Sequence, residues 1–289
     1  MIDRLNFDLN KTSTNVDGIY TLSNHKKIDH DSNCKNDFKL ISESDLTSND
    51  TINNPNRCVG LRLLEIKSGD IGINYGCSWG NSLVYVAKNC HTMVAIDQNI
   101  KKLMFVQKRL NKENLKNTFL INCKIQEKLH LNKSFNFSII NGTLSQVSGK
   151  QSHLNFLKMV NSNLKKDGKL FLAVKNMLSP QYFLTSLWPF SDNQYLYSYS
   201  GYLNLLKESG FNKVTTYVVF PDYHFPLKLL PLIKNIKSSY APVYHQRLKR
   251  NFANKIIGKL RTNLDLLIFK KFELFKLSPS FIFIAQSDV

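Results

Sequence analysis

A short glycine-containing segment, INYGCSWGNSL (residues 73–83), combines residue types that suit a ligand-binding loop. Gly76 and Gly80 allow the backbone to turn sharply and to approach a ligand closely, and a helix that follows them would offer free N–H groups. The spacing Gly76-x-Ser78-x-Gly80 differs from the G-x-G-x-x-G pattern of dinucleotide-binding loops. By itself the segment therefore fits two interpretations, a cofactor loop and an ordinary strand-to-helix turn.

Asp97 is the second residue that suggests chemistry. It ends the apolar segment TMVAID and follows Gly76 by 21 residues. A carboxylate at the end of a second strand can accept hydrogen bonds from both hydroxyls of a ribose. The same residue could also cap a helix that begins near Ile100. The loop and Asp97 together favour a ligand of the nucleoside type.

The elements that would position these residues alternate along the chain. Apolar runs predict strands at 70–76, 92–97, 118–124, 135–141, 169–176, 213–220 and 280–286. Helical spacing of apolar residues predicts helices at 81–90, 99–115, 153–168 and 200–211, the third of them stopped by Gly168. Strands that alternate with helices in this way predict a parallel sheet covered on both faces, with ligands bound at the carboxyl ends of its strands.

Composition sets broad limits on the class of protein. The chain has 289 residues, 43% of them hydrophobic, which suits one large domain with its own core. Its apolar runs are strand-length and fall short of a membrane span, so we expect a cytoplasmic protein. Five cysteines show no C-x-x-C spacing and predict no metal site. The net charge of +18 would suit a nucleic acid, an anionic membrane face or an acidic small molecule.

These segments resemble the class I S-adenosylmethionine-dependent methyltransferases. The resemblance rests on INYGCSWGNSLVYVAKNCHTMVAIDQN, SFNFSIINGTLSQV and HLNFLKMVNSNLKKDGKLFLAVKN. They are similar to that family's glycine loop and ribose-binding acid, its fourth strand, and the approach to its fifth. The resemblance implies S-adenosyl-L-methionine as cofactor. It also implies a Rossmann-like, doubly wound α/β sheet of seven strands, with the last strand antiparallel and inserted between the fifth and the sixth.

The tail, YSYSGYLNLLKESGFNKVTTYVVFPDYHFPLKLLPL (residues 197–232), is similar to a bacterial subgroup of that family. That subgroup has a P-D-Y-x-x-P turn and a helical insertion before the last strand, and its members often accompany glycosyltransferases of surface-glycan pathways. The resemblance implies a small-molecule or glycan-type acceptor. We expect a loosely ordered arm over residues 1–56 that holds at most one short helix, and a methyltransferase domain over 57–289 with a helical insertion at about 227–276.

Carried over residue by residue, the resemblance assigns cofactor binding to Asn74, Tyr75, Gly76, Ser78, Gly80, Asp97, Gln98, Asn141 and Gly142. The small loop residues would line the methionine portion of the cofactor. Asp97 would bind the ribose, with Gln98 beside the adenine. Asn141 and Gly142 would border the methyl donor.

Three positions depart from the family pattern, which usually places acids where Asn74, Lys124 and Asn136 stand. Asn74 can still accept a hydrogen bond from an ammonium group, although a neutral acceptor forgoes the stronger charge-assisted bond. A protonated Lys124 cannot accept a hydrogen bond from the adenine amine. These departures leave open a second hypothesis, a catalytically impaired relative that serves as a binding or scaffold protein.

No residue is assigned as catalytic, although His153, His224, Tyr199 and Asp222 lie in segments that could face the strand ends. A general base would assist a hydroxyl or amine acceptor. The alternatives are a surface position on a helix for His153 and a packing role for Tyr199. The turn PDYHFP (221–226) could form a wall of the acceptor pocket or simply launch the next element.

The remaining hypotheses concern partners. The segment 228–271 contains eleven Lys and Arg residues and one acid, and it suits a membrane surface, a phosphorylated carrier or a solvated helical flap. An RNA methyltransferase is motivated by charge alone. It is disfavoured because residues 141–144 read NGTL rather than the [DN]-P-P-[YF] motif of base-modifying enzymes. The glycine spacing also disfavours a nicotinamide-dependent oxidoreductase.

Overall fold

The computed structural model of the chain describes residues 12–14, 18–22, 55–127, 135–180, 195–226, 228–232 and 274–288. Its strands are β1 (Thr12–Thr14), β2 (Ile19–Leu22), β3 (Ile71–Tyr75), β4 (Thr92–Asp97), β5 (Thr118–Asn122), β6 (Phe135–Asn141), β7 (Leu164–Lys175), β8 (Phe211–Phe220), β9 (Lys228–Pro231) and β10 (Ser280–Ser287). Its α-helices are α4 (Asn81–Ala87), α5 (Ile100–Lys112), α6 (Lys150–Asn163) and α8 (Tyr199–Glu208). Three 3₁₀ helices are η4 (Pro55–Leu64), η5 (Thr143–Gln146) and η6 (Leu274–Leu277).

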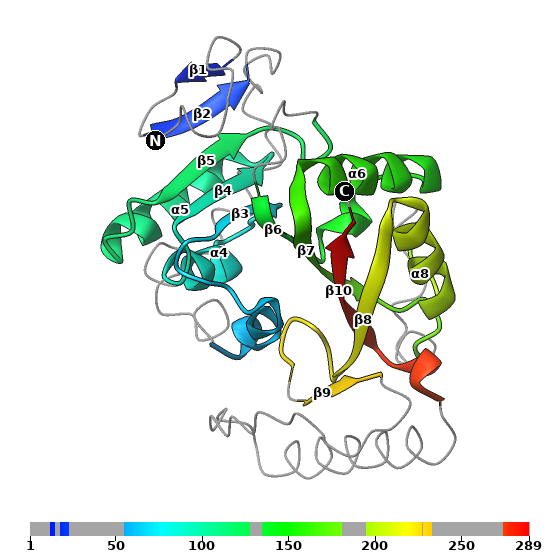
Figure 1. Cartoon of the computed structure of the whole chain (residues 1–289). Helices are drawn as coiled ribbons and strands as arrows, with labels where there is room; N and C mark the ends of the chain where they lie inside the picture. The colour runs from blue at the N-terminus through cyan, green and yellow to red at the C-terminus, as the bar shows by residue number, and fades with distance from the viewer. Residues whose placement is uncertain are drawn as a thin grey trace, which may run out of the picture.

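The strands described form one mixed sheet in the order β1-β2-β5-β4-β3-β6-β7-β10-β8-β9 (Figure 1). From β2 to β7 the neighbouring strands are parallel. β10 runs antiparallel between β7 and β8, as expected for the last strand. The expected count of seven is wrong, because β1, β2 and β9 extend the sheet at its two ends to ten strands.

The helices divide between the two faces of the sheet (Figure 1). One apolar cluster joins α4, α5 and η4 to the sheet, and the other joins α6 and α8 to its opposite face. Helix α5 shows why the sequence folds in this way. Leu103, Val106 and Leu110 recur at helical spacing and are all buried, while the Asn99 side chain caps the helix start by accepting the N–H of Lys102.

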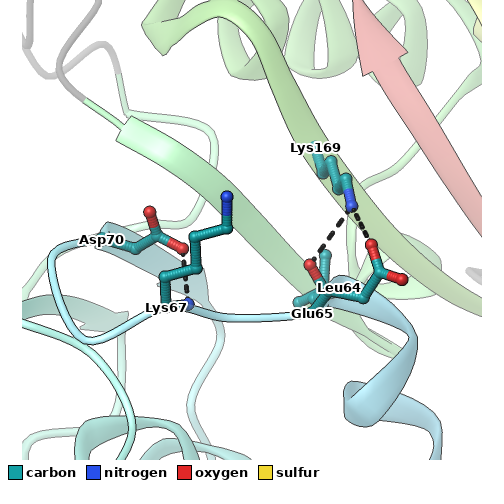
Figure 2. Close-up of polar contacts among 5 residues, drawn as sticks. All are labelled: Leu64, Glu65, Lys67, Asp70 and Lys169. Carbon is teal, nitrogen blue, oxygen red and sulfur yellow. Dashed lines mark hydrogen bonds and ion pairs between the residues drawn. The ribbon is translucent and has the colours of Figure 1, made fainter.

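The 3₁₀ helix η4 crosses one face of the sheet from its carboxyl edge to its amino edge. At its start, Cys58 Sγ lies 3.5 Å from the carbonyl oxygen of Asn81, the first residue of α4. At its end, Lys169 Nζ contacts the carbonyl oxygen of Leu64 at 3.5 Å and Glu65 Oε2 at 2.9 Å (Figure 2). Figure 2 also shows the Asp70 carboxylate accepting the N–H of Lys67 just before β3. The start of η4 therefore lies at the ligand-binding edge.

The helix expected over residues 153–168 ends before its glycine. α6 ends at Asn163, and β7 begins at Leu164, which is fully buried and pairs with Phe135 of β6. A Cβ on Gly168 would lie 2.8 Å from the Lys165 carbonyl oxygen. The glycine therefore allows an irregular backbone near the start of β7. The helix ends five residues earlier than the pattern indicated because Leu164 is buried against the sheet.

Both ends of the sheet use segments that the sequence did not mark as strands. Most of the expected N-terminal arm lies outside the described residues, but β2 pairs with β5 and buries Ile19. At the other end, residues 228–231 pair antiparallel with β8, where a helical insertion was expected to begin. Residues 233–273 of that insertion lie outside the described residues, so its helical character there stays a prediction.

Candidate functional site

The loop between β3 and α4 adopts a conformation that favours glycine. Gly76, Ser78 and Gly80 have φ angles of 77°, 50° and 77°. A Cβ on Gly76 would lie 2.2 Å from Thr143 Cγ2, and one on Gly80 would lie 2.9 Å from Val106 Cγ2. Both glycines are therefore required by close packing as well as by backbone geometry. Ser78 holds the same left-handed conformation with an exposed side chain, at some cost in strain.

Asp97 lies directly beside this loop. Its Oδ2 accepts the N–H of Ser78 at 2.8 Å, and its Oδ1 accepts the N–H of Asn99 at 2.9 Å. The residue is 8% exposed, so its carboxylate is largely withdrawn from water. Each carboxylate oxygen can accept more than one hydrogen bond, so both keep acceptor capacity for a ribose. The structure thus brings together the loop and the acid that the sequence singled out.

Helix α5 also holds the loop, through Arg109. The sequence did not predict this contact. Arg109 Nη1 contacts the carbonyl oxygen of Trp79 at 2.5 Å and Oδ1 of Asn81 at 2.9 Å. Trp79 packs edge-on against Phe105, with Lys102 Nζ 5.7 Å from the centre of the indole ring. Burial lowers the pKa of Arg109, but a guanidinium remains charged in proteins. The charged guanidinium therefore fixes the loop to α5 through two hydrogen bonds from Nη1.

The end of β6 forms the opposite wall of the site. The hydroxyl of Thr143 donates to the carbonyl oxygen of Tyr75 at 2.7 Å, and Nδ2 of Asn141 donates to Ser82 Oγ at 3.1 Å. These bonds connect β6 to β3 and to the start of α4. Gly142 has a φ of 77°, and a Cβ there would lie 2.2 Å from the hydroxyl oxygen of Tyr223. The turn after β8 therefore contacts Gly142, which is one of the residues predicted to border the methyl donor.

Two buried acceptors in this region have no hydrogen-bond partner among the described residues. They are Oδ1 of Asn74, whose residue is 1% exposed, and Oδ1 of Asn141. Leaving such an atom unpaired costs about 1–3 kcal/mol. Asn74 pairs with Ile139 across the sheet, and Asn141 lies two residues further along β6, so both side chains belong to the α4 side. An amide oxygen can accept a hydrogen bond from an ammonium group, so the chemistry of these residues fits the amino-acid end of the expected cofactor.

The remaining predicted cofactor residues lie in different surroundings. Gln98 is exposed just beyond Asp97, and Lys124 is exposed after β5. The Tyr75 side chain points to the opposite face, where it accepts a hydrogen bond from Nδ2 of Asn163 at 3.1 Å and packs on Phe156. Only its backbone faces the loop. Tyr75 therefore supports the fold with its side chain.

Asn136 lies at the amino edge of the sheet, away from the loop. Its Oδ1 accepts the N–H of Ile71 at 3.0 Å and contacts Lys165 Nζ at 3.3 Å. An amide oxygen there completes the hydrogen bonding at the start of β3. The departure from the family at this position therefore does not affect the site.

His153 is buried rather than on the helix surface, which corrects the sequence-based expectation. It is 0% exposed, with Nε2 2.6 Å from the carbonyl oxygen of Val147 and Nδ1 2.8 Å from the hydroxyl of Tyr197. A carbonyl can only accept, so Nε2 carries the proton and Nδ1 accepts from the tyrosine. Burial lowers the pKa of His153. With both nitrogens bound to the protein, His153 has a structural role.

Tyr199 also packs within the fold, in agreement with the packing role that was one of the two interpretations of this residue. Its ring lies 5.4 Å from that of Phe275 and 6.3 Å from that of Phe283. Helix α8 thereby covers β10. The two remaining candidates, Asp222 and His224, lie in the turn after β8, where Asp222 Oδ1 accepts the N–H of His224 at 2.7 Å.

The part of the chain that the structure describes contains neither a metal cluster nor a membrane-spanning helix. No three His, Cys, Asp or Glu side chains gather there as a metal ion would require. No helix there is long and apolar enough to cross a membrane. The basic segment 228–271 lies almost entirely outside the described residues, so its expected partners stay predictions.

The chain resembles known methyltransferases in sequence over one region and in structure over most of its length. Residues 73–172 match a family model described as a methyltransferase domain. A phosphoethanolamine N-methyltransferase 2 of Haemonchus contortus, solved with S-adenosyl-L-methionine, is 14% identical with a TM-score of 0.55, over 85% of this chain and 57% of that one. No curated protein matches the sequence.

Two further solved structures have the same fold. A Thermotoga maritima protein described as a SAM-dependent methyltransferase, possibly acting on histamine, is 15% identical with a TM-score of 0.50, over 86% of this chain and 97% of that one. The [4+2]-cyclase SpnF is 12% identical with a TM-score of 0.54, over 81% of this chain and 80% of that one. Because one of these proteins is a cyclase, the shared fold does not by itself determine the reaction.

Proposed function

We propose that this chain, which carries a methyltransferase domain over residues 73–172, is an S-adenosyl-L-methionine-dependent methyltransferase of class I that acts on a small-molecule or glycan-type acceptor. The observation that carries the proposal is the assembly at the carboxyl ends of β3, β4 and β6. The Asp97 carboxylate accepts the N–H of Ser78 from the glycine loop, and two buried amide oxygens at the same edge of the sheet have no partner among the described residues. Each of them matches a different part of the cofactor.

The bound cofactor supplies an activated methyl group on a sulfonium centre. The chain's own residues bind it and align it, which accounts for much of the catalysis expected for such a transfer. Asp97 accepts from the ribose, and the loop backbone allows close approach of the methionine portion. Asn74 and Asn141 accept from the ammonium group.

The acceptor side is formed by the end of β6 and by the turn after β8. Tyr223 is 5% exposed and reaches Gly142, so the turn excludes water from the position where the methyl group would be. The Tyr223–Gly142 contact favours the interpretation in which residues 221–226 form a wall of the acceptor pocket. No catalytic base is assigned, which suits an acceptor whose nucleophile is already poised.

A catalytically impaired binding or scaffold protein is the second candidate, and the neutral Asn74 and the basic Lys124, which stand where the family usually has acids, favour it. An acid in place of Asn74 would give a charge-assisted bond to the ammonium group, which a neutral amide cannot give. If this candidate is correct, the wild type binds no cofactor and the double variant Asn74→Asp, Lys124→Asp gains binding. Cofactor binding and turnover by the wild type would exclude it.

A transfer assay tests the proposed reaction. The full-length chain is incubated with S-adenosylmethionine labelled in its methyl group, together with fractions of small molecules, glycans and RNA from a bacterial extract. We expect label in the small-molecule or glycan fraction, and none in an Asp97→Ala control. Label confined to RNA would contradict the acceptor class and would support the RNA methyltransferase hypothesis.

A further inference from the structure

The hydroxyl group of Tyr223 is a largely buried polar group that touches one of the predicted methyl-donor residues. Tyr223 lies in the turn after β8 and is 5% exposed. The atoms nearest to a Cβ built on Gly142 would be the hydroxyl oxygen, Cζ and Cε2 of Tyr223, none of them more than 3.0 Å away. The hydroxyl end of the phenol therefore packs directly against the backbone of Gly142, at the end of β6.

The packing of Tyr223 also places it on the same face of the sheet as the two unpaired amides. Tyr223 belongs to the apolar cluster that contains Ile139 of β6, Ala173 of β7 and the buried residues of α4. Ile139 pairs with Asn74, and Ala173 pairs with Asn141. Paired residues of neighbouring parallel strands project to the same face of the sheet. The phenol and both amides therefore lie on the α4 face.

The turn that carries Tyr223 is held by contacts around it. Oδ1 of Asp222 accepts the N–H of His224 at 2.7 Å, and the rings of Tyr223 and His224 lie 4.2 Å apart. The guanidinium of Arg57, at the start of η4, lies over Phe225 at 5.0 Å from the ring centre. These contacts hold the phenol at the end of β6 before any ligand binds, so its dipole is already oriented.

A phenol oxygen at this position suits a positive charge. A hydroxyl oxygen has two lone pairs, so it can accept from a ligand whatever partner its own proton has. A dipole acts more strongly where water is excluded than at the surface. The methyl group of a sulfonium carries polarised hydrogens, which form weak C–H···O contacts with such an oxygen. The Tyr223 oxygen therefore offers a cation a fixed, partly desolvated acceptor.

We propose that the Tyr223 hydroxyl recognises the positively charged, methyl-bearing end of the cofactor and so distinguishes S-adenosyl-L-methionine from its neutral demethylated product. This inference rests on the proposed function, which places the methyl donor beside Gly142. S-adenosylhomocysteine keeps its contacts with Asp97 and the loop, but it has neither the charge nor the methyl group that faces Tyr223. The contact therefore favours binding of the methyl donor and release of the product.

Two cofactor analogues separate this contact from the rest of the site. Sinefungin has a carbon atom bearing an ammonium group where the cofactor has its methylated sulfur, and S-adenosylhomocysteine has a neutral sulfur there. Both are titrated by calorimetry into the full-length wild type and into Tyr223→Phe, which removes the hydroxyl alone. We expect Tyr223→Phe to weaken sinefungin binding by about tenfold or more, as for loss of a hydrogen bond to a charged group, and S-adenosylhomocysteine binding by less than about twofold. S-adenosyl-L-methionine itself should bind about two- to fivefold more weakly, as for loss of a C–H···O contact.

The matched control is Tyr202→Phe, which removes a buried phenol hydroxyl from the opposite face of the sheet. Tyr202 is 1% exposed and donates to the carbonyl oxygen of Lys175 at 3.0 Å. We expect this variant to lower the Tm and to leave the ratio of sinefungin affinity to S-adenosylhomocysteine affinity unchanged. If Tyr223→Phe does not fold in a thermal melt, Tyr223→Met, which fills apolar space without a phenol, is judged by the same ratio.

An unchanged ratio in Tyr223→Phe, with S-adenosylhomocysteine bound as tightly as by the wild type, would overturn this inference and leave the proposed function intact. Equal losses of both ligands would also overturn it, because the hydroxyl would then have a structural role alone. The same holds for a change of ratio in Tyr202→Phe as large as in Tyr223→Phe. No binding of either ligand to the wild type would contradict the proposed function and this inference together.

Discussion

The amide N–H of Ser78 donates to Oδ2 of Asp97 at 2.8 Å, and this bond joins the loop after β3 to the end of β4. The loop and the acid therefore form one unit before any ligand arrives. Asn99 contributes a second N–H to the same carboxylate. Asp97 thus has two roles, since it holds the loop in place and presents acceptor oxygens to a ribose.

Because Asp97 has two roles, we predict that its substitution lowers both the stability of the protein and its affinity for the cofactor. Asp97→Asn removes the charge from two backbone contacts, so the free energy of unfolding should fall by about 1–3 kcal/mol. Cofactor affinity should fall more than tenfold, because the ribose loses its charged acceptor. Chemical denaturation and calorimetry measure the two effects. Unchanged cofactor affinity in a destabilised variant would mean that Asp97 only holds the backbone at Ser78 and Asn99.

For Ser78 we predict that replacement by glycine raises the free energy of unfolding instead of lowering it. Ser78 holds a φ of 50°, which a side chain rarely adopts, and its own side chain is exposed. Ser78→Gly should therefore stabilise the protein by about 1 kcal/mol or less, since relief of strain is partly offset by the greater freedom of glycine in the unfolded chain. The matched control is Gly76→Ser, which should destabilise because Thr143 occupies the space of its Cβ. A loss of stability in Ser78→Gly would show that the serine side chain makes a necessary contact.

Arg109 is predicted to act as a positioning residue for the loop. Arg109→Met should lower the free energy of unfolding by about 1–3 kcal/mol, because the carbonyl oxygen of Trp79 loses its charged donor. It should also weaken cofactor binding by several-fold. Arg109→Lys should recover part of the affinity, whereas Lys112→Met, at the exposed end of the same helix, should change neither quantity. Loss of stability with full cofactor affinity would assign Arg109 a structural role alone.

We predict that the burial of His153 makes the folded protein less stable in mild acid. The pKa of His153 is lowered in the folded protein, so below its ordinary value of about 6.5 the unfolded chain binds the proton more readily. The contribution of neutral His153 is therefore fully present above pH 6.5, and it is lost as the pH falls from there through the lower folded pKa.

Unfolding free energies measured at several pH values between 5 and 7.5 check this prediction. One proton contributes a slope of at most about 1.4 kcal/mol per pH unit. His153→Gln should reduce the slope by up to that amount, while the burial-lowered pKa of His224 keeps a residual slope of the same sign. An unchanged slope in His153→Gln would contradict the account.

Much of the fold was predictable from the sequence because its central strands are short, apolar and buried. β4 and β6 have the predicted bounds, and the antiparallel place of β10 followed from the family resemblance. The outer strands were not predictable, because polar or proline-containing segments such as residues 12–14 and 228–231 become strands only by pairing with a sheet already formed.

The site was predictable where it depends on local sequence and not where it depends on distant contacts. Gly76, Gly80 and Asp97 could be found from their spacing, and the structure brings them together. The Arg109–Trp79 contact joins residues 30 positions apart, and nothing in the pattern of α5 distinguishes that arginine from its basic neighbours. The burial of His153 depends on Tyr197, which lies 44 residues further along the chain.

Titration of the full-length wild type with S-adenosyl-L-methionine tests the central claim most directly. We predict a single site with a Kd below about 100 μM, which corresponds to a free energy stronger than about −5.5 kcal/mol, and a loss of more than tenfold in Asp97→Asn. No heat of binding at millimolar ligand, from protein that unfolds cooperatively, would contradict the account.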